Sequence, residues 1–255
     1  MGHLTDLEVA FDAADRAAGL ALTFFATGVT ATTKADGTPV TDADLAVERL
    51  LRESLAAARP GDAFLGEEHG RTGESERVWI LDPIDGTGYF ARNDPNWRIH
   101  VALEVGGVTE LAVVTSPALG LRWWATRGGG AFEGPWPAVD GGARRLAVSA
   151  TSRVGDAALE AFEGAARAEL PSGFRPPSSP LPLVELVRGE IDALLAEGYH
   201  AWDHAPWILL VDEAGGAFTD VTGGHASDAG GGLYSNTALH DALFTTLAYP
   251  LRRGA

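Results

Sequence analysis

The stretch from Val78 to Phe90, VWILDPIDGTGYF, constrains this chain more than any other. Its first four residues are all apolar, which predicts a short strand that is buried on both faces. Asp82 and Asp85 follow directly, on either side of Pro83 and Ile84. Because proline fixes the backbone between them, we expect both carboxylates to converge on one point at the end of the strand.

Two carboxylates held that close repel each other unless a cation lies between them, and hard divalent ions such as Mg²⁺ prefer oxygen ligands. Gly86 and Thr87 come next and can open a helix, so their backbone N–H groups would point at a bound phosphate. Acids at the end of an apolar strand are also costly without a partner. The stretch therefore predicts a metal site beside a phosphate site.

The bulk properties exclude several classes of protein. The chain has 255 residues, enough for one large domain or two small ones, and 19 basic against 35 acidic residues give a net charge of −16. That balance argues against a nucleic-acid or anionic-membrane partner. The absence of cysteine excludes disulfides and thiolate metal sites. The N-terminal segment lacks the pattern of a signal peptide and no apolar run could span a membrane, so we expect a cytoplasmic protein.

Helices and strands are predicted to interleave along the chain. Apolar residues at helical spacing predict a helix over residues 4–26, and Thr41 can cap a second helix that ends near Ala58. A short strand over 63–65 leads into Gly66-Glu67-Glu68, and successive strands over 97–127 predict an antiparallel meander.

The second half is less regular. Residues 156–170 suit a helix by composition, although their first half could equally be a strand. Further elements are expected as strands over 144–149 and 191–195 and near Phe218 and Leu233, and as helices over 183–187, 202–214 and 239–247. Because strands and helices alternate without strict βαβ regularity, a layered α/β or α+β architecture is favoured.

Other acidic residues stand at the ends of predicted elements, and each has a plain structural explanation. Asp44 suits the first turn of a helix, Glu67 a solvated turn, and Asp203 a helix cap. Scattered histidines are more often surface or satisfied core groups than ligands, and the chain has such residues at His69, His100, His200 and His204. The functional hypothesis therefore depends mainly on the segment from Asp82 to Thr87.

Three motifs occur in an order that matches a known family. They are Gly66-Glu67-Glu68, WILDPIDGT at 79–87 and WDHAPWILLVDEAGG at 202–216. With them the chain resembles the inositol monophosphatase family of Mg²⁺-dependent phosphatases over nearly its whole length. The resemblance also covers Lys34, residues 41–44 and residues 116–132, and the last two stretches are most similar to the histidinol-phosphate phosphatase branch.

The resemblance implies an α-β-α-β-α sandwich of the sugar-phosphatase type. Residues 1–148 would form an N-terminal half that carries most metal ligands, and residues 149–255 a C-terminal half that completes one compact catalytic unit. It also implies a homodimer that acts on a small phosphate ester.

The resemblance further implies the metal ligands. Glu67, Asp82 and the carbonyl of Ile84 would hold one Mg²⁺, and Asp82, Asp85 and Asp203 a second. A third ion could bind near Glu67, giving two or three ions per site. Together they would activate a water molecule and stabilise the leaving oxygen.

The catalytic residues implied by the resemblance are Thr87, Asp44 and Glu67. Thr87, paired with Asp44, would orient the attacking water and help to remove its proton. The N–H groups of Gly86 and Thr87 would hold the oxygens of the phosphate.

The substrate stays open, because the chain departs from the family pattern around Ser178-Ser179-Pro180 and at Ala196. Histidinol phosphate is the best single guess. The alternatives are a nucleoside, sugar or inositol monophosphate in another pathway, or a non-catalytic binding protein that kept the fold. Candidate substrate contacts are Glu197, His204, Arg175 and Lys34.

Overall fold

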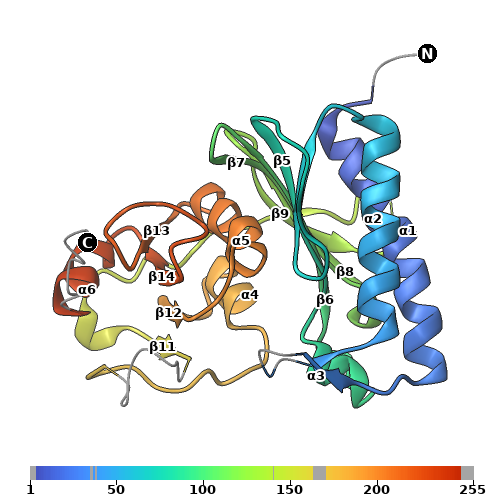
Figure 1. Cartoon of the computed structure of the whole chain (residues 1–255). Coiled ribbons are helices and arrows are strands. Elements are labelled where there is room, and N and C mark those ends of the chain that lie inside the picture. The colour runs from blue at the N-terminus through green and yellow to red at the C-terminus, as the bar shows by residue number, and fades with distance from the viewer. Residues whose placement is uncertain (1–3, 35–36, 38, 140, 163–170, 248–255) are drawn as a thin grey trace.

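The computed structural model describes the whole chain except residues 1–3, 35–36, 38, 140, 163–170 and 248–255. Five layers follow one another through the molecule (Figure 1). Helices α1 (Asp6–Thr27) and α2 (Asp42–Ala58) cover one face of an eight-stranded sheet, and α4 (Pro182–Val187) and α5 (Ala201–Glu213) pack between that sheet and a four-stranded sheet. Helix α6 (His240–Leu247) covers the outer face of the smaller sheet. The expected α-β-α-β-α sandwich is confirmed.

The larger sheet has the strand order β10-β9-β8-β7-β6-β5-β3-β4. Strands β3 and β5 are parallel, and every other neighbouring pair is antiparallel, which confirms the meander predicted from residue 97 onward. The strands are β3 (Ala63–Gly66), β4 (Gly70–Thr72), β5 (Arg77–Asp85), β6 (Arg98–Val105), β7 (Val108–Ser116), β8 (Leu121–Thr126), β9 (Gly130–Pro135) and β10 (Arg144–Arg145).

The smaller sheet has the order β11-β12-β14-β13. Its strands are β11 (Leu159–Ala161), β12 (Ala193–Glu197), β13 (Gly216–Asp220) and β14 (Gly231–Asn236). Only β11 and β12 are parallel neighbours in it. The remaining short elements are β1 (Thr32–Thr33), β2 (Pro39–Val40), α3 (Thr87–Ala91) and single 3₁₀ turns at Pro117–Leu119 and Val154–Asp156.

The structure resolves two expectations for the second half. Of the helix and the strand left open for the first half of 156–170, the strand is confirmed as β11 (Leu159–Ala161), because that segment pairs with β12; residues 163–170 lie outside the described residues. The strand expected over 144–149 is shortened to Arg144–Arg145, since only these two residues pair with β9. The boundary proposed at residue 148 falls between β10 and β11, and as a domain boundary it stays a prediction.

Strand β5 is longer than the strand predicted over residues 78–81. Strand β5 runs through Asp85, and its register with β6 shifts between Asp82 and Asp85. The two carboxylates therefore belong to an irregularity within the strand and not to a turn beyond its end, and such a bulge re-aims side chains.

Helices α1 and α5 differ in how they are buried. Helix α1 buries one stripe, made of Val9 and six alanines. Helix α5 is buried from Ala205 to Val211 because it packs between the two sheets. Within the described part of the chain, no helix has the length and apolar character needed to cross a membrane.

Candidate active site

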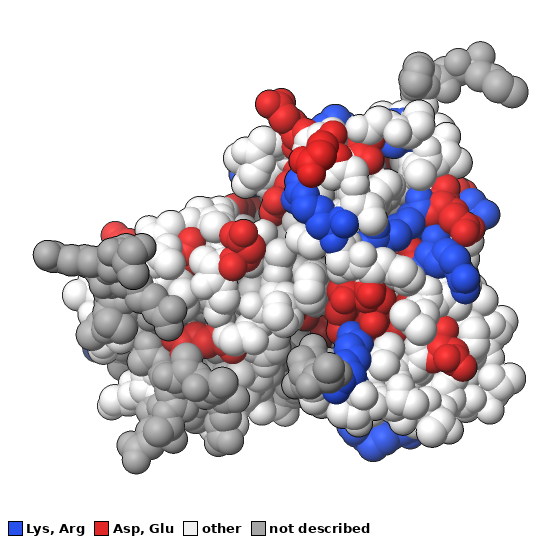
Figure 2. Space-filling view, viewed as in Figure 1, with Lys and Arg blue, Asp and Glu red and all other residues white. Residues whose placement is uncertain are grey.

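A cluster of carboxylates lies where β5 meets the start of α5. Asp82, Asp85 and Asp203 each offer an oxygen, and these atoms all lie within 4.8 Å of one another. The backbone N–H of Ile84 donates to Asp82 Oδ1 at 3.0 Å, and that of His200 donates to Asp203 Oδ2 at 2.8 Å. Figure 2 shows a group of acidic side chains near the junction between the two sheet-bearing parts of the molecule.

The carboxylates of the cluster destabilise one another's charge. Burial raises the pKa of Asp82 well above its ordinary value, and repulsion from Glu67, Asp85 and Asp203 adds to it. Burial, followed by repulsion from Asp85, raises the pKa of Asp203 to about 7. A site of oxygen ligands with surplus negative charge fits a hard divalent cation, which would relieve both effects.

Each end of the cluster carries a cation of the protein itself. Lys34 Nζ lies 2.8 Å from Glu67 Oε1 and 2.7 Å from Glu68 Oε1. Arg98 donates to Asp85 Oδ2 through Nε at 2.6 Å and also through Nη2. Burial alone would raise the pKa of Asp85, but the Arg98 guanidinium outweighs it and holds that pKa below its ordinary value.

The hydroxyl of Thr87 lies beside the cluster. Thr87 Oγ1 is 3.1 Å from Asp44 Oδ1 and 3.2 Å from the carbonyl of Ile84, and all three groups are buried. Asp44 is fixed by Thr41, the N-cap of α2, whose backbone N–H and hydroxyl donate to Asp44 Oδ2 at 2.8 and 2.6 Å. Burial raises the pKa of Asp44. Gly86 precedes Thr87 with φ 88°, a conformation that favours glycine.

Glu48, one turn beyond Asp44 on α2, holds the segment that carries Glu67. Its buried carboxylate accepts from the backbone N–H of Glu68 at 2.7 Å and from Arg52 Nε at 2.7 Å. A Cβ at Gly66 would lie 2.1 Å from Glu48 Oε1, so a side chain there would displace this carboxylate. Sequence reasoning missed Glu48, because a glutamate inside a helix has no motif that separates it from a surface residue.

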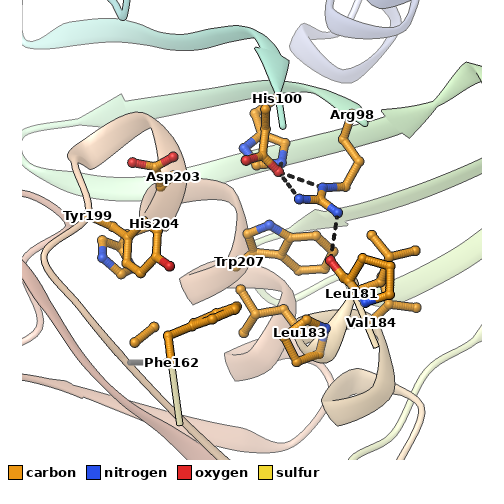
Figure 3. Close-up of a pocket in the computed structure, with 14 residues that line it drawn as sticks. Arg98, His100, Phe162, Leu181, Leu183, Val184, Tyr199, Asp203, His204 and Trp207 are labelled. Carbon is orange, nitrogen blue, oxygen red and sulfur yellow. Dashed lines mark hydrogen bonds and ion pairs between the residues drawn. The ribbon is translucent and has the colours of Figure 1, made fainter. Parts of the chain in front are cut away.

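A pocket opens next to the cluster and shares Asp85 and Asp203 with it (Figure 3). It holds about 500 Å³ of space, part of it open to solvent. Its walls are largely apolar and are formed by Phe162, Leu181, Leu183, Val184, Ala196 and Trp207. Arg98 and His100 reach it from β6, and His204 reaches it from α5.

The two pocket histidines use one ring nitrogen each. His100 Nδ1 lies 3.2 Å from the carbonyl of Trp202, and His204 Nδ1 lies 2.6 Å from the hydroxyl of Tyr234. The Nε2 atoms of both histidines are buried without a hydrogen-bond partner in the described part of the chain. Burial lowers the pKa of each ring to about 4, so both are neutral near pH 7.

The structure brings most of the predicted site residues together. Asp44, Thr87, Ile84 and the carboxylates Glu67, Asp82, Asp85 and Asp203 surround one centre, with Lys34 at its edge. Their assigned roles stay predictions.

The predicted substrate contacts separate into two groups. His204 lines the pocket. Glu197 is buried in β12, and Arg175 bonds to Glu160 at 3.1 Å with its side chain 58% exposed; neither is among the described residues that line the pocket. Arg98 and the apolar walls were missed, because no sequence motif marks them.

Comparison with known proteins gives a consistent family. The model of the inositol monophosphatase family matches residues 4–250. A histidinol-phosphatase from Mycobacterium tuberculosis is 39% identical over 97% of this chain and 99% of its own length. The extragenic suppressor protein suhB from Bartonella henselae superposes with a TM-score of 0.79 at 28% identity, covering 98% of this chain and 99% of that one.

One relative carries a name of another kind. A Streptomyces griseus protein named glucose-1-phosphate thymidylyltransferase is 41% identical over 94% of this chain and 95% of its own length. That name denotes transfer of a nucleotidyl group, whereas the name of the Mycobacterium tuberculosis relative denotes hydrolysis of a phosphate ester.

Proposed function

Because the chain belongs to the inositol monophosphatase family and is a phosphoric monoester hydrolase by that membership, we propose that it is a Mg²⁺-dependent phosphomonoesterase of small metabolites. Histidinol phosphate is the first substrate to test. The observation that carries the proposal is the convergence of Asp82, Asp85 and Asp203 next to the hydrogen-bonded pair of Thr87 and Asp44.

The proposed reaction is a hydrolysis. The oxygen of a water molecule forms a bond to phosphorus, the bond from phosphorus to the ester oxygen breaks, and a proton passes to the departing alcohol. The products are inorganic phosphate and the free alcohol. A bound divalent cation would supply the positive charge that makes water a stronger nucleophile and stabilises the leaving oxygen.

The metal ligands are assigned by position. Glu67, Asp82 and the carbonyl of Ile84 would hold one Mg²⁺, and Asp82, Asp85 and Asp203 a second, with a third near Glu67. All of these groups offer oxygen, as Mg²⁺ requires.

Thr87 and Asp44 are assigned to the attacking water. The Thr87 hydroxyl donates a hydrogen bond to the buried carboxylate of Asp44, so a lone pair of its oxygen can accept a hydrogen bond from the attacking water. As the water gives its proton to Thr87, the hydroxyl proton of Thr87 would pass to Asp44. The backbone N–H groups of Gly86 and Thr87 are assigned to the phosphate oxygens.

The names of the relatives and of the family favour different substrates. The name of the Mycobacterium tuberculosis relative favours histidinol phosphate, and the name of the family favours an inositol phosphate. A nucleoside or sugar phosphate is a further alternative. A cytoplasmic homodimer without nucleic-acid or membrane partners completes the proposal, and the net charge of −16 supports the absence of polyanionic partners.

The test is phosphate release from histidinol phosphate, inositol 1-phosphate, a nucleoside monophosphate and a sugar phosphate, with Mg²⁺ or with a chelator. Release that needs Mg²⁺ and disappears in Asp82→Asn supports the proposal. A separate arm supplies dTTP with glucose 1-phosphate and measures pyrophosphate. Pyrophosphate release without hydrolysis of any ester would show that the chain is a nucleotidyltransferase and overturn the proposal.

A further inference from the structure

The guanidinium of Arg98 makes a contact that is built into the larger sheet. Arg98 begins β6 and is the Cα partner of Asp85 on β5, directly after the register shift that follows Asp82. Nε at 2.6 Å and also Nη2 donate to the same oxygen, Asp85 Oδ2 (Figure 3). Because the pairing of the two strands places both residues, the contact is part of the fold and not a chance surface ion pair.

The rest of the guanidinium is also held. Nη1 donates to the carbonyl of Pro180 at 3.3 Å, and only 11% of the Arg98 side chain is exposed. A guanidinium offers its donors in a rigid planar fork and keeps its positive charge at every working pH. Arg98 therefore cannot leave Asp85 by losing a proton, and the Pro180 carbonyl keeps the charge close to the cluster.

Arg98 makes Asp85 unlike the two other carboxylates of the cluster. Burial and repulsion raise the pKa of Asp82 and of Asp203. Burial acts on Asp85 in the same direction, but the charge of Arg98 outweighs it and lowers the pKa. Among the described residues, no lysine or arginine forms an ion pair with Asp82 or Asp203. Asp85 alone of the three carries its negative charge beside a cation of the protein.

A divalent cation shared by Asp85 and Asp203 must compete with this contact. A carboxylate oxygen has about two lone-pair directions, and the two N–H groups of Arg98 already use those of Asp85 Oδ2. A cation on Oδ1 would still lie close to the guanidinium, and two positive charges repel each other strongly in a partly buried site. In either position, Arg98 weakens the binding of the cation.

We propose that Arg98 is an internal counter-ion of the carboxylate cluster, which holds Asp85 in the metal-free protein and competes with the divalent cation that Asp85 would share with Asp203. The inference rests on the proposed function for the identity of this cation as Mg²⁺. The cation is then held less tightly than the carboxylates alone would hold it.

The first experiment measures Mg²⁺ binding without any ester. Calorimetry on metal-free protein compares the wild type with Arg98→Gln, which removes the charge. The weakest-bound Mg²⁺ of the wild type should bind at least about tenfold more tightly to Arg98→Gln. Arg98→Lys keeps the charge and should stay within about threefold of the wild type. Unchanged binding in Arg98→Gln would overturn the proposal, and so would weaker binding, because Arg98 would then orient Asp85 for the cation.

Melting curves supply a matched control. In chelator, Arg98→Gln should melt below the wild type because Asp85 loses its partner, and saturating Mg²⁺ should raise its melting temperature by more than it raises that of the wild type. Arg77→Gln also removes an arginine with aspartate partners, Asp6 and Asp62, at the opposite end of β5. It should melt lower as well but gain from Mg²⁺ only what the wild type gains. Equal gains in the two variants would contradict competition at Asp85.

The third experiment follows the guanidinium in the wild type. The Nε–H resonance of Arg98, identified by its absence in Arg98→Lys, should exchange slowly with water in chelator because Nε donates to Asp85. Added Mg²⁺ should shift this resonance and speed its exchange with water. A resonance that saturating Mg²⁺ leaves unchanged would show that Arg98 and the cation hold Asp85 together, and would overturn the proposal.

Turnover separates this inference from the proposed function. For any ester that the wild type hydrolyses, Arg98→Gln should reach its half-maximal rate at an Mg²⁺ concentration about tenfold lower. Hydrolysis with an Mg²⁺ affinity that Arg98→Gln does not raise would leave the phosphatase standing and overturn the inference. Tighter Mg²⁺ binding in Arg98→Gln without hydrolysis of any ester would do the reverse.

Discussion

The two sides of the candidate active site, the carboxylate cluster and the pocket beside it, are opposite in chemical character. On one side, Asp82, Asp85 and Asp203 crowd negative charge into a buried space, and Lys34 and Arg98 bind only its edges. On the other side, leucine, valine and aromatic side chains form a pocket whose two neutral histidines keep unpaired nitrogens. The first side repels charge of its own sign, and the second offers a mainly apolar surface. Mutations on the carboxylate side should therefore change turnover of all esters alike, and mutations in the pocket should change the ratio of turnover between esters.

The largest effect is expected from Asp82→Asn. Loss of the carboxylate at the centre of the cluster should lower Mg²⁺-dependent turnover by ~10³-fold or more for every ester alike. The metal-free variant should melt a few degrees higher, because burial and the neighbouring carboxylates raise the pKa of Asp82, so folding at neutral pH forces this group to take up a proton or to carry a disfavoured charge, and asparagine does neither. Phosphate release and melting in chelator measure both effects.

Asp42→Asn is the matched control, since Asp42 is exposed in the first turn of the same helix as Asp44. Asp42→Asn should change neither the Mg²⁺-dependent turnover nor the melting temperature in chelator. A change in the ratio of turnover between histidinol phosphate and inositol 1-phosphate in Asp82→Asn would contradict the separation of the two sides.

Thr87→Val should cause the second-largest loss of turnover. Without the hydroxyl that bonds to Asp44, kcat should fall by ~10²- to 10⁴-fold at saturating Mg²⁺, again for all esters. Thr87→Ser keeps the hydroxyl and should restore most of the rate. Calorimetry should find Mg²⁺ affinity nearly unchanged in both variants; a large loss of affinity in Thr87→Val would make Thr87 a structural support of the metal site instead.

Glu48→Gln should act through metal binding. The amide keeps the size of the side chain but weakens its bonds to the Glu68 N–H and Arg52, so the segment that carries Glu67 should loosen. Mg²⁺ affinity is expected to drop by ~10- to 100-fold, with kcat recovered at high Mg²⁺. Glu53→Gln, exposed on the same helix, is the control. A lower kcat at saturating Mg²⁺ would contradict a positioning role.

Stability of the metal-free protein should fall as pH rises. The pKa of Asp203 is raised from 3.8 to about 7, so folded Asp203 holds its proton more tightly than unfolded Asp203. The free energy of unfolding therefore decreases between about pH 4 and pH 7, where only the unfolded state has lost this proton. Melting in chelator should show the fall, and Asp203→Asn or saturating Mg²⁺ should reduce it. A pH-independent melting temperature would show that folding does not disfavour the ionised form of these carboxylates.

The sequence by itself determined most of the elements in the first half and pointed to Asp82 and Asp85 as metal ligands. Helical periodicity, the Thr41 cap and the alternation of strands and helices are local signals. The helices over 6–27 and 42–58 and the meander were therefore predicted nearly as they are. Asp82 and Asp85 could be recognised because a carboxylate attached to an apolar strand already conflicts with its local surroundings. Glu67 and Asp203 carried no such local signal and were assigned only through the resemblance to a family.

The tertiary structure decided the state of β11 and the existence of the pocket, which no local sequence signal indicates. The short segment that forms β11 takes its state from its partner β12, and the pocket exists only because β6, α4 and α5 meet beside the cluster. Likewise, the carbonyl of Trp202 lies 3.2 Å from His100 Nδ1, although the two residues are 102 positions apart in sequence. Charge and periodicity are properties of neighbouring residues, whereas a pocket wall and an unpaired nitrogen are properties of packing between distant segments.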